Sequence, residues 1–335
     1  MTPAIGLSQV FASCLGLSGL PARASAQRTL QCDFMRQRSR LRNWVEYTLA
    51  LVVLKSLQWT PIGAADLLAR YYARLLDRWV PRLRRVAERN LVLALPELDA
   101  AARGVIVDGV FRSIARLLVS LARFPSIGHH NLDRWIRIEG AEHIDAALRQ
   151  GRGVLFATAH LGNWELSAFA HGLASGPMSV LARPLDNPLI DRLVERRRGL
   201  CGNRVIFKKD FARSILKALA ANDKVGILID QNASLDSGVF VDFFGVPACA
   251  GSGFAKIAAH SGAAVIPAYA LWAEDEGRYV LRFNPPVDIT GDAARDTAAL
   301  HADLEAAIRA NPDQWLWIHR RWKTRPPGEP PLYEE

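Results

Sequence analysis

The chain has few cysteines for its length, and they form no pattern. Its 335 residues include four, Cys14, Cys32, Cys201 and Cys249, scattered without paired spacing. Such scatter indicates neither a zinc site nor a disulfide framework. We therefore expect a reduced domain that faces the cytoplasm.

Two familiar catalytic signatures are missing as well. His160, Glu165 and His171 do not form His-Glu-x-x-His, which excludes that class of metalloprotease. The segment Gly251-Ser252-Gly253 is not the Gly-x-Ser-x-Gly elbow of serine hydrolases. We therefore predict no metal ion and no acyl-enzyme intermediate.

The chain also has no long uninterrupted apolar run. A typical membrane-spanning helix needs about twenty apolar residues. Residues 44 to 62 are mostly apolar, with aromatic residues near both ends, but Glu46, Lys55 and Gln58 interrupt them. We expect an interfacial or shallowly inserted anchor; a short single span and a buried core helix are the alternatives.

The chain has fewer acidic residues than basic ones. Lysine and arginine number 42 against 33 aspartates and glutamates, which gives a formal net charge of +9. This excess favours anionic partners: phosphate-bearing lipid, an acidic carrier protein, an anionic membrane surface or nucleic acid.

A basic helix is expected after the apolar segment. Thr60-Pro61 predicts the start of a helix that runs to about Trp79. Its arginines at 70, 74 and 78 share one face, and arginines at 82, 84, 85 and 89 continue the basic surface. We expect this surface to contact anionic headgroups; a solvated charged face is the alternative.

The first residues have two interpretations. Residues 4 to 26 end in Ala24-Ser25-Ala26, like a signal peptide cleavage site, but no basic region precedes them. Met35 opens a basic leader that runs into the apolar segment. We expect translation to start at Met35, with residues 1 to 34 disordered or absent from the native product.

Beyond Pro125 short strands and helices alternate. Strands are expected at 135–138, 153–158, 178–182, 225–229, 264–270 and 279–283. Helices are expected at 100–124, 144–150, 188–200, 210–221, 252–261 and 293–309. This alternation predicts an α/β fold with a mainly parallel, mixed sheet flanked by helices. The expected organisation is a leader (1–42), a helical membrane-associated region (43–130), an α/β domain (131–326) and a tail (327–335).

The segment Gly153 to Ala170 contains the strongest candidate site. An apolar strand ends at Thr158, and His160 follows its carboxyl end. Asn163 can cap a helix that carries Glu165 in its first turn. A carboxylate there could hold one imidazole nitrogen while the other accepts a proton from a hydroxyl. A capped helix with a surface glutamate is the plainer alternative.

Four blocks in order resemble the late, Kdo-dependent lauroyl or myristoyl acyltransferases of bacterial lipid A biosynthesis, within the glycerolipid acyltransferase superfamily. His160-Leu161-Gly162-Asn163-Trp164-Glu165 is similar to the His-x4-Asp/Glu motif. The other blocks are Arg183-Pro184-Leu185-Asp186-Asn187-Pro188, Phe243-Phe244-Gly245-Val246-Pro247-Ala248 and the segment from Gln314 to Pro326. The resemblance spans residues 43 to 326. It implies a fold like that of glycerol-3-phosphate acyltransferase, at the cytoplasmic face of the bacterial inner membrane.

The resemblance also implies the chemistry, which is transfer of a fatty acyl group from a thioester to a hydroxyl of a glycolipid such as a lipid A precursor. The thioester of acyl carrier protein or of coenzyme A is the co-substrate, and the acidic carrier fits the basic charge better. No cofactor and no nucleic acid is expected. His160 would be the general base, Glu165 would stabilise the imidazolium, and amides near Gly162 and Asn163 would stabilise the oxyanion.

The candidate substrate-binding residues are Asn163, Arg183, Asn187, Asp230, Phe244, Arg320 and Arg321. A guanidinium at 183 would match phosphate oxygens; an ion pair with Asp186 or Asp191 is the alternative. Asp230 could orient Arg183 or the acceptor sugar. Because His160, Arg183 and Asp230 each follow a predicted strand, we expect them to face one cleft.

Each of two aromatic segments has more than one possible role. Residues 243 to 247 could line an acyl-chain pocket or form a buried turn. The segment from Gln314 to Pro326 alternates tryptophans at 315, 317 and 322 with basic residues. We expect it to contact headgroups or carrier protein; a nucleic-acid patch and packing against the domain are the alternatives.

The chain departs from the family pattern in two places. Asn232 stands where a second carboxylate is usual, and residues 249 to 253 replace a threonine-rich run. The acceptor therefore stays open between lipid A precursor, a mannosylated phosphatidylinositol, another glycolipid and an aminolipid. A membrane-binding protein that keeps the fold without the chemistry is the non-enzymatic alternative.

Overall fold

A seven-stranded mixed sheet forms the centre of the computed structural model, which describes residues 39–207 and 211–333. Its strand order is β1-β9-β8-β2-β5-β3-β4. Neighbouring strands are parallel except β8 and β9, so the mainly parallel, mixed sheet expected from the sequence is confirmed. The seven strands are β1 (Ile136–Glu139), β2 (Val154–Thr158), β3 (Ser179–Ala182), β4 (Arg204–Phe207), β5 (Lys224–Leu228), β8 (Ala264–Ala273) and β9 (Arg278–Phe283).

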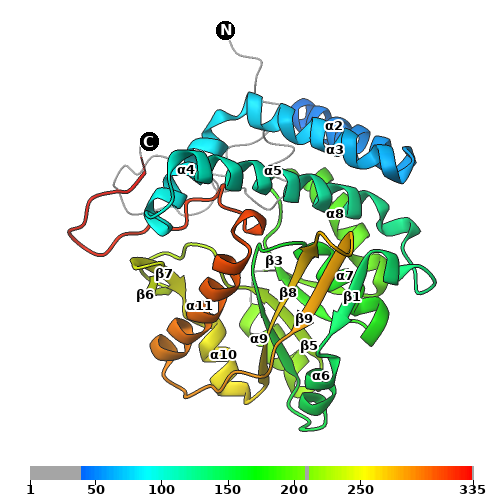
Figure 1. Cartoon of the computed structure of the whole chain (residues 1–335). Coiled ribbons are helices and arrows are strands. Elements are labelled where there is room, and N and C mark those ends of the chain that lie inside the picture. The colour runs from blue at the N-terminus through cyan, green and yellow to red at the C-terminus, as the bar shows by residue number, and fades with distance from the viewer. Residues whose placement is uncertain (1–38, 208–210, 334–335) are drawn as a thin grey trace.

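Helices surround this sheet, and a separate antiparallel hairpin, β6 (Gly238–Phe243) and β7 (Val246–Gly251), lies beside it. In Figure 1, α2 and α3 cross the top of the molecule, with α4 and α5 between them and the sheet. The helices are α2 (Arg40–Trp59), α3 (Ile62–Trp79), α4 (Pro81–Ala94), α5 (Ala100–Arg123), α6 (Ala141–Leu148), α7 (Trp164–Ser175), α8 (Pro188–Arg198), α9 (Phe211–Ala220), α10 (Gly253–Ser261) and α11 (Ala293–Ala310).

Strand β2 is buried on both faces, as its apolar sequence predicts. Leu155 and Ala157 pack in a cluster with apolar residues of α9 and α10. Phe156 points the other way and shares a cluster with Phe169 of α7. Alternate side chains of a strand face opposite sides, so the two helix layers each cover one face.

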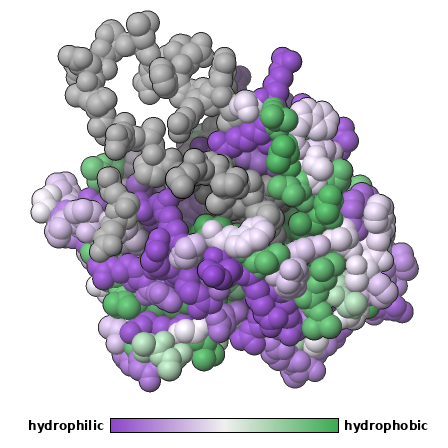
Figure 2. Space-filling model, turned by 90° about the horizontal axis from the view of Figure 1, so that it is seen from above, coloured by the Kyte–Doolittle hydropathy of each residue, from purple (hydrophilic) through white to green (hydrophobic). Residues whose placement is uncertain are grey.

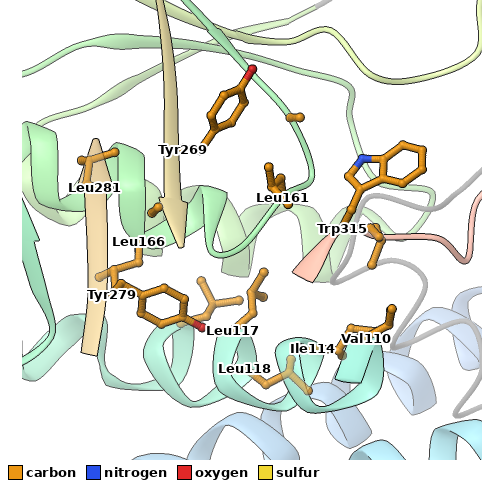
Figure 3. Close-up of a cluster of buried hydrophobic side chains, with 14 of the residues drawn as sticks. Val110, Ile114, Leu117, Leu118, Leu161, Leu166, Tyr269, Tyr279, Leu281 and Trp315 are labelled. Atoms are coloured by element: carbon orange, nitrogen blue, oxygen red, sulfur yellow. The ribbon is translucent and has the colours of Figure 1, made fainter. Parts of the chain in front are cut away.

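The helical layer on top of the sheet is held by α5. Ile114, Leu117 and Leu118 of α5 belong to the same hydrophobic cluster as Leu161 and Leu166, which lie in the segment that follows β2 (Figure 3). All five side chains are buried. This packing fixes the chain immediately after β2, where His160 lies.

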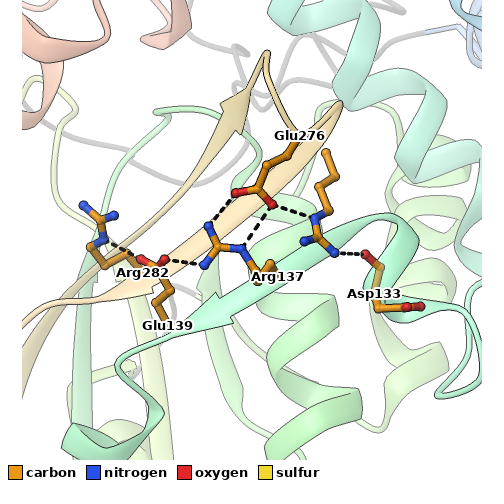
Figure 4. A network of polar contacts seen from close by, with 6 residues as sticks. Asp133, Arg137, Glu139, Glu276 and Arg282 are labelled. Atoms are coloured by element: carbon orange, nitrogen blue, oxygen red, sulfur yellow. Dashed lines mark hydrogen bonds and ion pairs between the residues drawn. The ribbon is translucent and has the colours of Figure 1, made fainter.

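An ion-pair ladder ties β1 to β9 at the edge of the sheet. Arg137 bonds Glu276 and Glu139, and Arg282 bonds Glu139 at 2.8 Å (Figure 4). Arg278 extends the ladder to Glu276 and to the carbonyl of Asp133. These contacts are partly exposed, so they add specificity to strand pairing more than stability.

The expected leader, residues 1 to 42, lies almost entirely outside the described residues, so the start at Met35 stays a prediction and the signal peptide its alternative. None of the helices formed by residues 39–207 and 211–333 combines the length and hydropathy that crossing a membrane requires. At the end of α2, Thr60 bonds the carbonyl of Ser56 through its hydroxyl. The N-cap of α3 is Pro61, which makes no side-chain hydrogen bond, so the helix begins at Ile62, just after the predicted Thr60-Pro61 start, and ends at Trp79 as predicted.

Candidate active site

His160 lies just past β2 and is held by the buried carboxylate of Asp230. His160 Nδ1 is 2.9 Å from Asp230 Oδ1, and the His160 backbone N–H donates to Oδ2 at 2.9 Å. The indole N–H of Trp315 donates to the same Oδ2 at 2.9 Å. Asp230 follows β5, which pairs with β2, so neighbouring strands bring the two groups together.

The electrostatics of this pair favour a charged carboxylate. Burial by itself would raise the pKa of Asp230, but the attraction and hydrogen bond of His160, with the Trp315 indole, lower it below its usual range. An ionised Asp230 accepts the Nδ1–H of the imidazole, which leaves Nε2 as the proton acceptor. Gln231 is the polar neighbour of that nitrogen, with its amide nitrogen 3.5 Å away.

Glu165 is not the partner of His160, contrary to expectation. Asn163 caps α7 through its side chain, which accepts from the Leu166 N–H at 3.0 Å, and Glu165 occupies the first turn as predicted. The carboxylate of Glu165 pairs instead with Arg198 of α8, whose Nε donates to it at 2.9 Å. Burial would lower the pKa of Arg198, but the charge and hydrogen bond of Glu165 outweigh it and leave that pKa raised.

The backbone amides expected to stabilise an oxyanion are already occupied. Gly162 N–H donates to the carbonyl of Gln314, and Asn163 N–H donates to that of Ala270, both at 2.9 Å. These bonds hold the segment after β2 against β8 and the C-terminal chain. That expectation is therefore wrong, because the tertiary contacts of the loop use both donors.

A cavity of about 390 Å³ opens beside His160. Polar groups at its His160 end come from Glu165, Arg183, Arg198 and Gln231. The rest of its lining is mainly apolar and includes Phe156, Phe169, Met178, Val180, Leu181, Gly226, Leu228, Ala268 and Phe283. Ligand sites in proteins have this volume and this combination of apolar walls with a few polar groups.

The cavity runs along the face of the sheet that α7 covers. Thr158 and Phe156 are two apart on β2, and Leu228 and Gly226 are two apart on β5, so each pair faces the same side. The polar end therefore lies where the strands end, and the apolar part extends back toward their beginnings. A long apolar chain could lie there with its reactive head at His160.

The cleft expected to unite three strand ends is present for two of them. His160 and Arg183 both line the cavity, while Asp230 is fully buried and acts on His160 from within the protein. Arg183 is exposed and forms no ion pair with any residue of the described ranges, so the alternative pairs with Asp186 and Asp191 are not made. Asp191 accepts the Leu185 N–H instead.

Asn163 and Asn187 hold helices in place. The Asn163 amide donates to the hydroxyl of Ser120 on α5 at 2.7 Å, besides capping α7. Asn187 caps α8 and donates to Glu46 of α2 at 3.0 Å. Both are fully buried and neither lines the cavity, so direct substrate contact is not supported for them.

Phe244, Arg320 and Arg321 also lie away from the cavity. Phe244 is buried in the β6–β7 turn with φ of 59°, and its N–H donates to Glu305 at 2.5 Å. Arg321 is fully buried and donates to the Cys249 carbonyl at 2.8 Å; burial lowers its pKa to about 10. Arg320 is half-buried over the ring of Tyr333. None of residues 243 to 247 lines the cavity, so of their two possible roles the acyl pocket is not supported. Phe243 and Phe244 are buried in the turn, whereas Gly245 and Pro247 are exposed.

The tryptophans of the segment from Gln314 to Pro326 are core residues. Trp315, Trp317 and Trp322 are each fully buried, and the Trp322 indole donates to the Val246 carbonyl at 3.3 Å. Packing of this segment against the domain, rather than headgroup or carrier contact, accounts for these side chains.

Asn232 explains one departure from the family pattern. Its amide nitrogen donates to Thr324 Oγ1 at 2.9 Å, and its oxygen accepts from the Thr324 N–H at 2.9 Å. A carboxylate could not supply the donated bond. The amide thus fastens the C-terminal segment beside the cavity.

Sequence reasoning missed three residues of the site. Trp315 belongs to the fourth block and Gln231 directly follows Asp230, but nothing local indicates that Trp315 contacts Asp230 or that Gln231 lies beside His160. Arg198 is one of three consecutive arginines in the last turn of α8, and its position among them does not distinguish it. Its signal is the buried, charged Glu165, because such a group needs a partner.

A family model described as "Bacterial lipid A biosynthesis acyltransferase" matches residues 31–324. The chain is 32% identical over 266 residues to a lipid A biosynthesis lauroyltransferase of Escherichia coli K12, covering 78% of this chain and 85% of the relative. It is 28% identical over 305 residues to the palmitoleoyltransferase of the same strain, covering 90% and 99%. A phosphatidylinositol mannoside acyltransferase of Mycobacterium tuberculosis H37Rv is 31% identical over 267 residues, covering 78% and 82%.

Proposed function

The chain belongs to the bacterial lipid A biosynthesis acyltransferase family, and we propose the reaction, base and donor of this member from its site. It transfers a fatty acyl chain from an acyl carrier protein thioester to a hydroxyl of a lipid A precursor. The observation that carries the proposal is the His160–Asp230 pair at the polar end of an apolar cavity.

His160 acts as the general base. The acceptor hydroxyl gives its proton to Nε2 while its oxygen attacks the thioester carbonyl carbon. The tetrahedral intermediate then expels the carrier thiolate, which takes the proton back from the imidazolium. Asp230 stabilises the imidazolium through its contact with Nδ1, and a positioned base typically contributes about 10²- to 10⁴-fold to the rate.

Glu165 acts through Arg198. Two bonds fix the Arg198 guanidinium at the wall of the cavity. A fixed cation there is suited to stabilise the negative charge that develops on the thioester carbonyl oxygen, since the nearby amides of Gly162 and Asn163 are engaged. Arg183, exposed at the same end, is suited to bind a phosphate of the acceptor.

The helical layer supports attachment to the membrane surface. On α2 and α3, Trp44, Trp59 and Leu67 expose 58%, 75% and 67% of their surface, and Arg74 and Arg78 are exposed beside them. Figure 2 looks down on this layer and shows hydrophobic residues interspersed with hydrophilic ones. Apolar and basic side chains on one surface favour the interface of an anionic bilayer, here the cytoplasmic face of the inner membrane.

The test is mass spectrometry of glycolipids from cells with and without the gene, complemented by wild type or by His160→Ala. We expect one lipid A species to lose the mass of an acyl chain in the deletion and in His160→Ala. His260→Ala, at an exposed position of α10, should restore it like wild type.

Two outcomes count against the proposal. If the missing mass falls on another glycolipid, the acceptor is wrong, and the likeness to the mannoside acyltransferase supplies the next candidate. If no lipid changes mass, or His160→Ala restores the lipid, the catalytic assignment fails and the non-catalytic membrane-binding alternative is favoured.

A further inference from the structure

A buried histidine lies at the inner end of the cavity, and it makes no hydrogen bond with the described residues. His171 of α7 is 1% exposed, lines the cavity, and neither ring nitrogen has a hydrogen-bond partner among the described residues. Its ring packs edge-on against Phe156 and Phe283, with centroids 5.2 and 5.6 Å away. We propose that His171, with Met178 and Gly226, ends the acyl channel and sets the length of the chain transferred, which rests on the function proposed above.

The position of His171 fits the end of a channel. Trp164 lies against the His160 ring, at the start of α7, with centroids 4.8 Å apart. His171 is seven residues further along this helix, about 10 Å away at 1.5 Å per residue. The same direction runs along β2 from Thr158 to Phe156, so helix and strand walls both lead from the base to His171.

The chemistry of His171 makes it a stop for a hydrocarbon. Burial, reinforced by the positive charge of Lys224, lowers the pKa of His171 to about 3, so the ring is neutral. Buried polar nitrogens lose free energy when nothing hydrates them or bonds to them. A methyl end pushed against the ring would exclude water from both nitrogens, whereas a chain that stops short of it leaves room for water.

Gly226 and Met178 narrow the same end. A Cβ built at Gly226 would lie 2.6 Å from the Met178 Cε, the far end of a flexible side chain. Both residues line the cavity. A methyl group at 226 therefore either takes up channel space itself or moves the Met178 methyl, and the channel shortens.

The experiment measures transfer to a lipid A precursor from carrier-protein thioesters that carry saturated chains from decanoyl to stearoyl, with products identified by mass spectrometry. His171→Ala should shift the preference to longer chains, and Gly226→Ala to shorter ones. A methylene that fits or fails to fit an apolar pocket changes selectivity about 10- to 200-fold, so the ratio of rates for adjacent chain lengths should change at least tenfold. Gly104→Ala, in open space on α5, is the matched control and should keep the wild-type profile.

The outcomes separate the two proposals. If wild type transfers no chain from any donor, the proposed function fails. If wild type transfers and both variants keep its length profile, the function stands and the assignment of His171 is overturned. If His171→Ala does not fold, Met178→Ala takes its place and should lengthen the preferred acyl chain. An unchanged length profile in Met178→Ala would also overturn the inference.

Discussion

At the scale of single residues, Asp230 organises the site. One buried carboxylate accepts from the His160 ring, the His160 backbone and the Trp315 indole. Removing one donor leaves a buried, charged acceptor less satisfied, which costs about 1–3 kcal/mol. The site is therefore sensitive to changes in residues that never touch substrate.

Trp315→Phe tests this sensitivity. We expect a free energy of unfolding lower by about 1–3 kcal/mol, from the lost indole donor and a small void, and a changed pH dependence of acyl transfer. Trp317→Phe is the control, because that equally buried indole donates to the Pro312 carbonyl. Denaturant unfolding and pH–rate curves measure both; an altered pH profile in Trp317→Phe, or none in Trp315→Phe, would contradict the role.

Gly162 has a conformation that only glycine adopts without strain. Its φ is 64°, and a Cβ there would lie 1.9 Å from the Ala270 carbonyl oxygen. Gly162→Ala should therefore separate the loop from β8 and abolish transfer, with a lower melting temperature. Gly104→Ala, in the interior of α5, should instead stabilise by about 0.5–1 kcal/mol; equal melting temperatures for both variants would be inconsistent with this account.

Local pattern predicted part of the site and could not predict the rest. The Asn163 cap, Glu165 in the first turn and His160 after a strand all follow from a few neighbouring residues. The Asp230 contact depends on β5 lying next to β2, although 65 residues or more separate them in the chain. Pairing of Glu165 with Arg198 likewise depends on how α8 packs against α7.

At the scale of elements, α2 joins the helical layer to the catalytic domain through a buried polar contact. Glu46 is 1% exposed, pairs with Arg42 and accepts from Asn187, which caps α8. Glu46, one of the residues that interrupt the apolar segment, thus faces the protein. Its opposite face carries exposed Trp44 and Trp59, which leaves that face for another partner.

Replacing both Trp44 and Trp59 with serine should weaken membrane binding. Because both side chains are more than half exposed, stability should change little. Flotation with vesicles of mixed anionic and neutral lipid measures the binding, and thermal melting checks the fold. Full binding by the double variant would show that this face does not dock to lipid.

Most strands could be located from sequence, but the β6–β7 hairpin could not. Its turn places Phe244 and Gly245 at φ of 59° and 73°, a turn usually signalled by Asn-Gly or Asp-Gly. A bulky residue at positive φ persists here because Glu305 accepts its N–H. Strand β4 was missed since its residues are half exposed at the sheet edge.

At the scale of the whole molecule, buried neutral histidines predict acid sensitivity. Burial, with the charges of Lys224 and Arg321, lowers the pKa of His171 to about 3 and of His301 to about 4, against 6.5 unperturbed. At pH values between the lowered pKa of each histidine and 6.5, that histidine binds a proton in the unfolded chain but not in the folded chain. Stability therefore falls as pH drops below about 6.5, by up to about 1.4 kcal/mol per pH unit for each histidine.

His301→Phe should remove the contribution of one proton to the slope of stability against pH. Between pH 6.5 and 5 the variant should lose about 2 kcal/mol less than wild type, which denaturant unfolding at the two pH values measures. His260→Phe, at an exposed histidine, should keep the wild-type slope. A His301→Phe slope equal to that of wild type would mean that His301 binds its proton as readily in the folded chain as in the unfolded chain, which contradicts this account.

The most direct test of the central claim compares the pH–rate profiles of Asp230→Asn and Glu165→Gln for acyl transfer to a lipid A precursor. If Asp230 orients and stabilises His160, Asp230→Asn lowers the rate by about 10²- to 10⁴-fold and changes the pH–rate profile, because it removes the buried carboxylate that interacts with the imidazole. Glu165→Gln should lower the rate without that change in profile, because its carboxylate acts on Arg198. A wild-type profile for Asp230→Asn, or a changed profile in Glu165→Gln alone, would contradict the account.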